Sequence, residues 1–488
     1  MASSRVPSEL LDLIFRDSRL ERHDVTQFAR VSQDWQAVAT SIIWENLTGI
    51  LPLIALMPEG VWSWMDSADG KLLQVKSNDR TCLRPLTEED WIPVYARSCL
   101  VKDLTIRTDY ALREFWTDFP LQAVHAIFAC LPAQCLLPSL RQLHFEIYLL
   151  YDAGKTDTIS SKLLALVTSP RFTSPALKGA NFHFGVNTVR CTEAHVSLLL
   201  RTLLGTWTSV RTVNIELPVY RPDLLPSLAQ LSSLEVLDMG FGEVVYDLAL
   251  PPSPMLRFLS LRSLTMRAVT PDVITVLICS SRLPSLETLI GNGLNCTHAG
   301  QLTPLMQALY RHIPHDNLRH LRLHAPRGCR VATLRFEHLQ PLAAFRCISH
   351  VEMKTTDCTM LTDVEHAEIS SWWPALEILK FTPVIFAVET YATPGALVHY
   401  ARHCPNLRKL QIPLIVHQPM QETLLDSETS THALETLWVG QSPFKEELVE
   451  EAVRLINALF PNLVEIVYES RSSSEAWNRI KQAVRYCH

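Results

Sequence analysis

Glycine is scarce in this sequence, which contains only 15 glycines among 488 residues. No segment matches G-x-x-x-x-G-K-[ST] and no G-x-G-x-x-G follows an expected strand, so the common phosphate-cradling loops are missing. Neither H-E-x-x-H nor G-x-S-x-G occurs. These absences argue against a nucleotide-binding domain, a zinc metalloprotease and a serine hydrolase.

Cysteine pairs and long apolar runs are also lacking. The 12 cysteines are irregularly spaced without a C-x-x-C pair, so they indicate neither a zinc ribbon nor a disulfide framework. The chain does not open with a basic segment followed by an apolar stretch, and it has no run of about 18 uncharged apolar residues. We expect an intracellular protein, cytoplasmic or nuclear, without a metal or cofactor.

Charge of one sign does not dominate the chain. The formal net charge is -6 and the pI is near 6.3, which gives no global attraction to nucleic acid or to an anionic membrane. Hydrophobic residues make up 47% of the sequence, enough for a large core. The composition predicts a folded protein with neither nucleic acid nor membrane as a partner.

A short apolar pattern recurs from Val101 onward. It consists of an apolar residue, two variable residues, a second apolar residue, one variable residue and a third apolar residue, as in Leu318/Leu321/Leu323. Thirteen copies begin at Val101, Leu140, Leu177, Val210, Leu234, Leu261, Leu286, Leu318, Ile348, Leu376, Leu407, Leu434 and Leu463, and the copy at Leu286 has a weak third position, Gly291. The last two apolar positions have strand period and point to one side, so each copy predicts a short β-strand.

Proline supports this phasing, because in six copies it stands two residues before the first apolar position. These prolines are Pro138, Pro175, Pro284, Pro374, Pro405 and Pro461. Proline disfavours helix in the residue before it, so a helix tends to end there before the strand begins.

Helix-like stretches lie between the expected strands. They are residues 192–204, 270–279, 298–312, 394–404 and 442–460, and a last one at 474–486 would cover the final unit. Thr270-Pro271 and Ser442-Pro443 are typical of an N-cap followed by a first-turn proline.

A strand and a helix repeated at about 30 residues predict an α/β leucine-rich-repeat solenoid. In such a fold a parallel sheet lines the concave side and helices cover the convex side. The alternative is an ordinary doubly wound α/β domain, which the missing glycine loops disfavour. We expect the solenoid, with its C-terminal capping helix, to span residues 97–488.

The first fifty residues differ from everything after them. An amphipathic helix is expected from Val6-Pro7 to Phe15, a second helix after Asp24, and a third from Trp35 to Trp44. Three helices this short carry more large apolar groups than they can bury alone.

Residues 5 to about 50 contain three strings, V-P-x-E-L-L-x-x-I-F, D-V-x-x-F-A-R-V-S-x-x-W and I-W-E-N-L. Through these strings the segment resembles an F-box. The F-box is expected at 1–50 and a helical linker capping the solenoid at 51–96. That linker and the string from Cys404 to Leu410 are similar to F-box proteins that mushroom-forming fungi carry in large numbers. The resemblance implies binding to a Skp-type adaptor on a cullin scaffold, with the repeats presenting a client for ubiquitin transfer.

The adaptor contact implied by this resemblance is helix against helix, through apolar anchors that water would otherwise touch. The candidates are Pro7, Leu10, Leu11, Ile14, Val31, Trp35 and Trp44. Alternatively, about half of them form the core of the bundle itself, and Trp44 packs under the first repeat.

The variable positions of each strand are expected on the concave face, because alternate side chains of a strand point to opposite faces. In the middle and late repeats the candidate client-binding residues are Arg267, His320, Arg322, His324, His350, Lys354, Lys380, Lys409 and Trp438, the last as an aromatic anchor. Acidic residues prevail in the early units and in the last one, at Asp103, Glu146, Glu216, Asp238, Glu465 and Glu469. The basic stripe predicts an acidic or phosphorylated client segment, the alternative being a solvated polar face.

No residue set predicts catalysis. His350-Val351-Glu352 and Glu365-His366-Ala367-Glu368 place titratable groups close together, but neither has the spacing of a metalloprotease motif. We therefore expect a non-catalytic substrate receptor of a ubiquitin ligase. The alternatives are a repeat scaffold that binds partners without ubiquitin transfer and, more remotely, a hydrolase.

Overall fold

The computed structural model of this chain describes residues 6–62, 64–67, 70–73, 84, 86–109, 127, 129–130, 134–148, 164–166, 168–184, 199, 201–202, 205–217, 224–246, 255–296, 299–325, 335–355, 361–383, 391–417, 432–440, 442, 444–468 and 474–485. Most of the expected helix at 192–204 lies outside these residues, as do Pro443, Glu469 and Tyr486. The chain divides into two compact units, Met1–Leu234 and Glu235–His488.

The first unit opens with three short helices, α1 (Ser8–Phe15), α2 (Arg22–Phe28) and α3 (Gln33–Glu45). Glu21 and Asp24 form a capping box at the start of α2. The Ser32 hydroxyl accepts a hydrogen bond from the backbone N–H of Trp35 and so caps α3. The three expected helices are therefore present.

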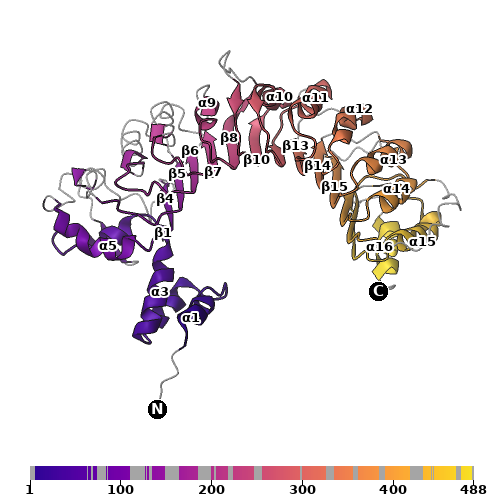
Figure 1. The fold of residues 1–488 in the computed structure, drawn as a ribbon. Helices are drawn as coiled ribbons and strands as arrows, with labels where there is room; N and C mark the ends of the chain where they lie inside the picture. The colour runs from indigo at the N-terminus through magenta and orange to yellow at the C-terminus, as the bar shows by residue number, and fades with distance from the viewer. Residues whose placement is uncertain are drawn as a thin grey trace. The chain divides into compact units, whose positions relative to one another are not determined.

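Helix α3 leads directly into a strand, β1 (Asn46–Thr48), as Figure 1 shows. β1 pairs in parallel with β4 (Asp103–Asp109), and the order continues through β5 (Gln142–Tyr148), β6 (Gly179–Phe184) and β7 (Thr212–Leu217). The sheet thus begins at Asn46, before the solenoid boundary expected at 97.

The segment between β1 and β4 contains α4 (Leu51–Ile54), an antiparallel hairpin of β2 (Trp64–Ser67) and β3 (Gly70–Leu73), a 3₁₀ turn η1 (Glu88–Trp91) and α5 (Ile92–Ser98). A short helix α9 (Leu224–Leu228) follows β7. Trp91 is buried and donates its indole N–H to the carbonyl of Cys130, 2.9 Å away. This contact attaches the segment to the repeats that follow.

The second unit contains nine parallel strands of the sheet in its described residues. Their order is β8 (Val236–Val245), β10 (Ser263–Val269), β12 (Thr288–Asn292), β13 (His320–His324), β14 (His350–Thr355), β15 (Ile378–Pro383), β16 (Lys409–Gln411), β17 (Thr436–Gly440) and β18 (Glu465–Tyr468). A two-stranded pair, β9 (Leu256–Arg257) and β11 (Ser281–Arg282), lies apart from it.

Helices lie on one side of these strands (Figure 1). They are α10 (Pro271–Cys279), α11 (Leu302–His312), α12 (Phe336–Leu339), α13 (Asp363–Trp372), α14 (Gly395–His403), α15 (Val449–Leu459) and α16 (Ser474–Arg485), with 3₁₀ turns η3 (Ala299–Gln301), η4 (Gln340–Ala344) and η6 (Glu446–Leu448). Helix α16 buries Trp477, whose indole N–H donates to the Ser442 carbonyl at 3.1 Å.

The core follows the predicted repeat closely. All thirteen residues at the first apolar position, and all thirteen at the second, are at most 1% exposed. Each copy contributes one strand to the sheet, and helices cover the face toward which these residues point. The fold is therefore the expected leucine-rich-repeat solenoid, preceded by a three-helix bundle.

Two expected helix starts have different outcomes. Helix α10 begins at Pro271 as predicted, although the Thr270 hydroxyl makes no capping hydrogen bond. The helix expected from Ser442 is wrong in its start, because α15 begins at Val449 after the turn η6. The Ser442 hydroxyl instead accepts the backbone N–H of Leu414 at 2.7 Å, which joins two neighbouring repeats.

Candidate functional site

The three-helix bundle has an aromatic core. Phe15, Phe28 and Trp35 contact one another with ring centroids 5.2 to 5.7 Å apart. Leu11 and Val25 are buried beside them. The expectation that Leu11 contacts a partner is wrong for this fold, because its side chain has no exposed surface. Trp35 is partly buried and packs against the same core, and Trp44 is half-buried on α3.

One side of α1 exposes apolar side chains. Leu10, Leu13 and Ile14 are 51%, 68% and 49% exposed, and we call these three residues the α1 stripe. They lie three and four positions apart, so they share one side of the helix. Of the other candidates, Pro7 and Val31 are exposed as well. Sequence reasoning missed Leu13, although its spacing from Leu10 could have found it.

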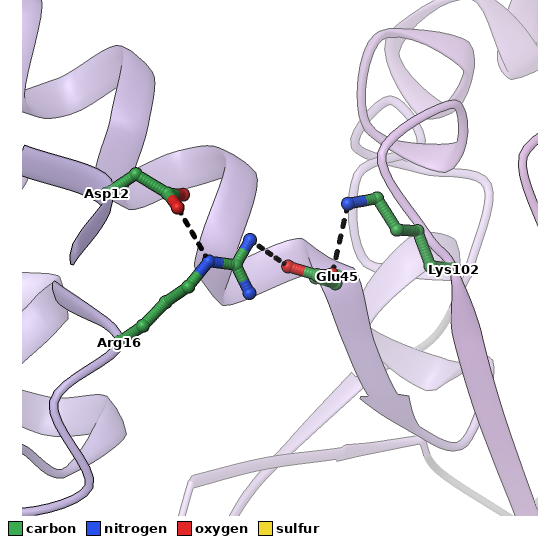
Figure 2. Close-up of polar contacts among 4 residues, drawn as sticks. All are labelled: Asp12, Arg16, Glu45 and Lys102. Atoms are coloured by element: carbon green, nitrogen blue, oxygen red, sulfur yellow. Dashed lines mark hydrogen bonds and ion pairs between the residues drawn. The ribbon is translucent and has the colours of Figure 1, made fainter. Parts of the chain in front are cut away.

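A network of charged side chains joins the bundle to the first repeat (Figure 2). The Arg16 guanidinium lies 2.9 Å from an Asp12 carboxylate oxygen and 2.7 Å from one of Glu45, and the Lys102 ammonium lies 3.0 Å from the other Glu45 oxygen. Burial raises the pKa of Glu45, but the hydrogen bonds from Arg16 and Lys102 outweigh this and hold it below its usual value. Glu45 therefore stays charged where α3 ends and β1 begins.

The backbone reinforces this junction. The N–H of Lys102 donates to the carbonyl of Glu45 at 2.9 Å, and the N–H of Gly49 donates to the carbonyl of Thr105 at 2.7 Å. The same bond recurs between later repeats, as from Arg141 to Lys102. Glu45 thus occupies the position that precedes a strand in every repeat, and α3 is joined to the sheet without a linker.

In the second unit, strand register places the predicted client-binding residues on one face. Arg322 on β13 lies beside Glu352 on β14, and Glu352 lies beside Lys380 on β15. We call the face opposite the buried apolar residues the open face. It carries all nine predicted residues, namely Arg267, His320, Arg322, His324, His350, Lys354, Lys380, Lys409 and Trp438, because each occupies an alternate position to the buried ones.

Glu352 neutralises much of this positive charge. Its carboxylate lies 3.0 Å from the Arg322 guanidinium, 3.0 Å from His324 Nε2, 3.4 Å from His350 Nε2 and 3.7 Å from the Lys380 ammonium. The hydrogen bonds from His324 and His350, helped by the two cations, hold the pKa of Glu352 far below its usual range. Sequence reasoning found these residues on one face but missed Glu352 as their shared partner.

Arg267 also has an acidic neighbour. Its Nε lies 3.3 Å from a carboxylate oxygen of Asp238 on β8. Gly240 lies beside Arg267 in the sheet, where an added Cβ would come within 2.9 Å of the guanidinium. By contrast, Lys354 and Lys409 form no ion pair with any residue that the structure describes.

Trp438 is half-exposed on β17, between Gln411 on β16 and Val467 on β18. The pairing of β17 with β18 shifts between Trp438 and Gly440, and Gly440 has a left-handed backbone with φ of +61°. A Cβ on Gly440 would lie 2.7 Å from the indole ring. Glycine at position 440 therefore allows the left-handed backbone and also leaves space for the indole ring of Trp438.

The same face in the first unit carries paired charges of both signs. Arg107 lies 2.9 Å from Glu146, and His183 Nδ1 lies 2.9 Å from Glu216. His144 and Asn181 share a hydrogen bond of 2.9 Å on neighbouring strands. The early acids Glu146 and Glu216 thus have partners within the protein itself. Asp103 and Glu465 also lie on strands of the sheet, whereas Glu469 lies outside the described residues.

The titratable groups considered for catalysis have other surroundings. His366 is fully buried, shares a hydrogen bond of 2.8 Å with the Tyr400 hydroxyl, and has a pKa lowered to about 3 by burial. His350 belongs to the group around Glu352. In the described part of the chain, His, Cys, Asp and Glu form no cluster of three or more suited to a metal ion. Within the same residues, every helix is too short or too polar to span a bilayer.

Comparison with known proteins adds little to this description. No family model and no curated protein matches the chain. One similar solved structure is a chain of the yeast Rad7 and Elc1 complex, with 14% identity, a TM-score of 0.35, and coverage of 89% of this chain and 88% of that chain. Another is an internalin of Listeria monocytogenes, with 14% identity, a TM-score of 0.35, and coverage of 71% and 80%. Similarity at this level does not assign a function.

Proposed function

We propose that this chain is the substrate-recognition subunit of a Skp-cullin-F-box type ubiquitin ligase, acting in the cytoplasm or nucleus. The observation that carries the proposal is the α1 stripe on a three-helix bundle whose last helix is joined to the repeat sheet. The F-box resemblance of residues 5 to about 50 agrees with this arrangement. In this function the bundle binds a Skp-type adaptor, and the repeat domain binds a client.

The exposed stripe is suited to helix-to-helix docking. Three large apolar side chains are exposed on the eight residues of this helix. Each Å² of their surface that a partner buries adds about 25 cal/mol of favourable free energy to binding. The aromatic core behind them fixes the helix, so docking requires little reordering of the bundle. An adaptor helix packing on the stripe would cover these side chains from water.

Catalysis in this proposal belongs to the partners. The chain contributes a high effective concentration, because it holds the client and the adaptor on one polypeptide. Ubiquitin transfer is therefore expected from the assembled ligase and not from the isolated chain.

Co-purification with a Skp-type adaptor and a cullin tests the proposal. We expect the full-length chain to form a complex with both, and the double variant Leu10→Ser with Ile14→Ser to bind the adaptor at least about tenfold more weakly, a loss of about 1.4 kcal/mol or more. Val364→Ser is the matched control, since Val364 is an exposed apolar residue on α13. Equal binding by the wild type and the double variant would contradict the proposal.

The cullin separates this function from a repeat scaffold. A scaffold would bind a client, and even the adaptor, without recruiting a cullin or supporting ubiquitin transfer. A complex that contains the adaptor but never a cullin would therefore favour the scaffold.

For the client we propose an acidic or phosphorylated segment on the open face of the second unit. Arg267, Arg322 and Lys380 contact acidic neighbours, so Lys354 and Lys409 are the cations with most charge left for a partner. Charge reversal of both, Lys354→Glu with Lys409→Glu, is expected to abolish client capture and leave adaptor binding intact. Unchanged capture would exclude an acidic client at these lysines.

A further inference from the structure

The part of the open face around Trp438 differs from the part around Glu352. On β13 to β15 the cations surround a carboxylate of the protein itself. Lys409 on β16 is exposed and forms no ion pair with a residue that the structure describes, and Trp438 on β17 is half-exposed one strand further on. Lys409 pairs with Thr436 and Gln411 pairs with Trp438, so the cation is a diagonal neighbour of the indole, and both are accessible to a ligand.

The indole of Trp438 is held in place before any ligand binds. Its ring lies against the backbone of Gly440, where the strand pairing shifts and the backbone is left-handed. A side chain at residue 440 would displace the ring and would also strain the backbone. An aromatic group fixed in this way loses little conformational freedom when a ligand packs on it, so it binds with a small entropic cost.

The spacing of the strands limits the ligand. Neighbouring strands lie about 4.8 Å apart and a strand advances about 3.3 Å per residue, so the backbone of Lys409, one strand and two residues from Trp438, is about 8 Å from it. Lys354 is two strands and four residues from Lys409, roughly 16 Å away, and belongs to another part of the open face. An extended peptide advances about 3.3 Å for each residue. A peptide crossing the strands can thus place one side chain on Trp438 and another near Lys409 when the two are within about three residues of each other.

We propose that the open face over β16 and β17 binds an extended peptide segment in which an anionic side chain lies within about three residues of a bulky apolar side chain. The apolar side chain packs on Trp438, and the anionic one contacts Lys409. This inference rests on the proposed function, because it names the kind of client segment that the receptor recognises. It adds an apolar requirement that a purely electrostatic site would not have.

A library of random 12-residue peptides displayed on phage, selected on the full-length chain, tests the proposal. We expect enriched peptides to pair Asp or Glu with Phe, Trp, Leu or Ile at a separation of three residues or fewer. Selected peptides are then synthesised with a fluorescent label, and their dissociation constants are measured by anisotropy. Replacing the acidic residue by phosphoserine tests whether a phosphate serves as well as a carboxylate.

Variants separate the two parts of the site. Trp438→Ala is expected to weaken a selected peptide at least about tenfold and to remove the preference for its apolar residue, and Lys409→Glu to remove the preference for its acidic residue. Gly440→Ala, with Trp438 present but displaced, should weaken binding as well. Tyr391→Ala and Lys445→Glu, exposed residues of the same types elsewhere in the unit, should bind like the wild type. Thermal melting of every variant confirms that it is folded.

Several results would overturn the proposal. They are enrichment of basic peptides, enrichment of acidic peptides without an apolar position, no enrichment at all, and equal weakening by the control variants. Adaptor binding is measured on the same preparations. Adaptor binding without peptide selection refutes only this inference, whereas peptide selection without adaptor binding refutes only the proposed ligase function.

Discussion

The charged side chains of the open face differ in how far the protein itself neutralises them. Glu352 has contacts with His324, His350, Arg322 and Lys380, so these four side chains are held around one carboxylate. A group of this kind stabilises the fold when all its members are present, and removing the carboxylate leaves the cations without compensation.

Glu352→Gln is therefore expected to lower the free energy of unfolding at pH 7, by about 1–2 kcal/mol for a half-buried charged hydrogen-bonding group. The pKa of Glu352 is lowered in the folded state, so its contribution is present above its ordinary pKa of 4.5 and is lost as the pH falls below that value. The melting temperatures of wild type and variant should converge in acid. Glu465→Gln, exposed on the same face, is the control, and a difference independent of pH would contradict this account.

His366 and Tyr400 offer a second test at the level of single residues. Both side chains are fully buried and share one hydrogen bond, so His366→Phe alone leaves the Tyr400 hydroxyl without its partner and is expected to cost about 1–3 kcal/mol. The double variant with Tyr400→Phe removes both polar groups and should be much closer to the wild type at pH 7. Chemical denaturation of the three proteins measures this. A double variant less stable than the single one would contradict it.

The same histidine makes stability depend on pH. Burial lowers the pKa of His366 to about 3 in the folded state, below its ordinary value of 6.5, so the unfolded chain binds the additional proton. The contribution of His366 to the free energy of unfolding is therefore complete above pH 6.5. It is lost as the pH falls toward 3, by up to about 1.4 kcal/mol for each pH unit. Between pH 7 and pH 5 the double variant should lose less stability than the wild type. An identical loss would show that His366 does not titrate in this way.

Among the structural elements, the junction of α3 with β1 decides how the bundle is held on the first repeat. It combines two backbone hydrogen bonds with the ion pairs of Glu45, whose side chain is only 14% exposed. The ion pairs join α1 to α3 and α3 to Lys102, so one carboxylate links three parts of the first unit (Figure 2).

Glu45→Ala is expected to loosen this junction without unfolding the bundle. Partly exposed ion pairs contribute up to about 1 kcal/mol to the free energy of local opening, and losing this amount makes amide exchange about fivefold faster. Hydrogen exchange measured by mass spectrometry should show the increase in peptides that contain Gly49 and Lys102. Asp12→Asn, which weakens the contact of Asp12 with Arg16 but keeps both ion pairs of Glu45, should leave these peptides unchanged. Faster exchange spread through the whole chain would indicate general destabilisation instead.

At this scale much of the fold could be predicted from the sequence, because the repeated apolar pattern marks each described strand of the long parallel sheet from β4 to β18. β1 was not predicted, since it has three residues and only Leu47 is buried. The helix start at Ser442 was not predicted correctly, because its hydroxyl contacts Leu414 in a neighbouring repeat. Contacts between residues about 30 positions apart decide such details, and a local pattern does not contain them.

The candidate site was predictable to a similar degree. Alternation along a strand placed the nine residues on one face, but the pairing of Arg322 with Glu352 depends on the register between strands. In α1, residues 10, 11, 13, 14 and 15 are all apolar, so the pattern did not show which side faces the core. Packing against Phe28 and Trp35 makes Leu11 and Phe15 the buried side.

At the scale of the whole molecule, the two units are expected to bind different partners. The first carries the α1 stripe, and the second carries the open face with Trp438 and the lysines. Loss of one activity should therefore leave the other intact. Variants of the α1 stripe are expected to bind the selected peptides normally, and Trp438→Ala is expected to bind the adaptor normally.

Hydrogen exchange of the full-length chain, alone and mixed with a purified Skp-type adaptor, shows whether the three-helix bundle binds the adaptor. We predict a stable complex of one chain with one adaptor, in which peptides covering Ser8–Phe15 exchange more slowly than in the chain alone. No complex at micromolar concentration, or a complex that protects only residues outside the three-helix bundle, would contradict the proposed function.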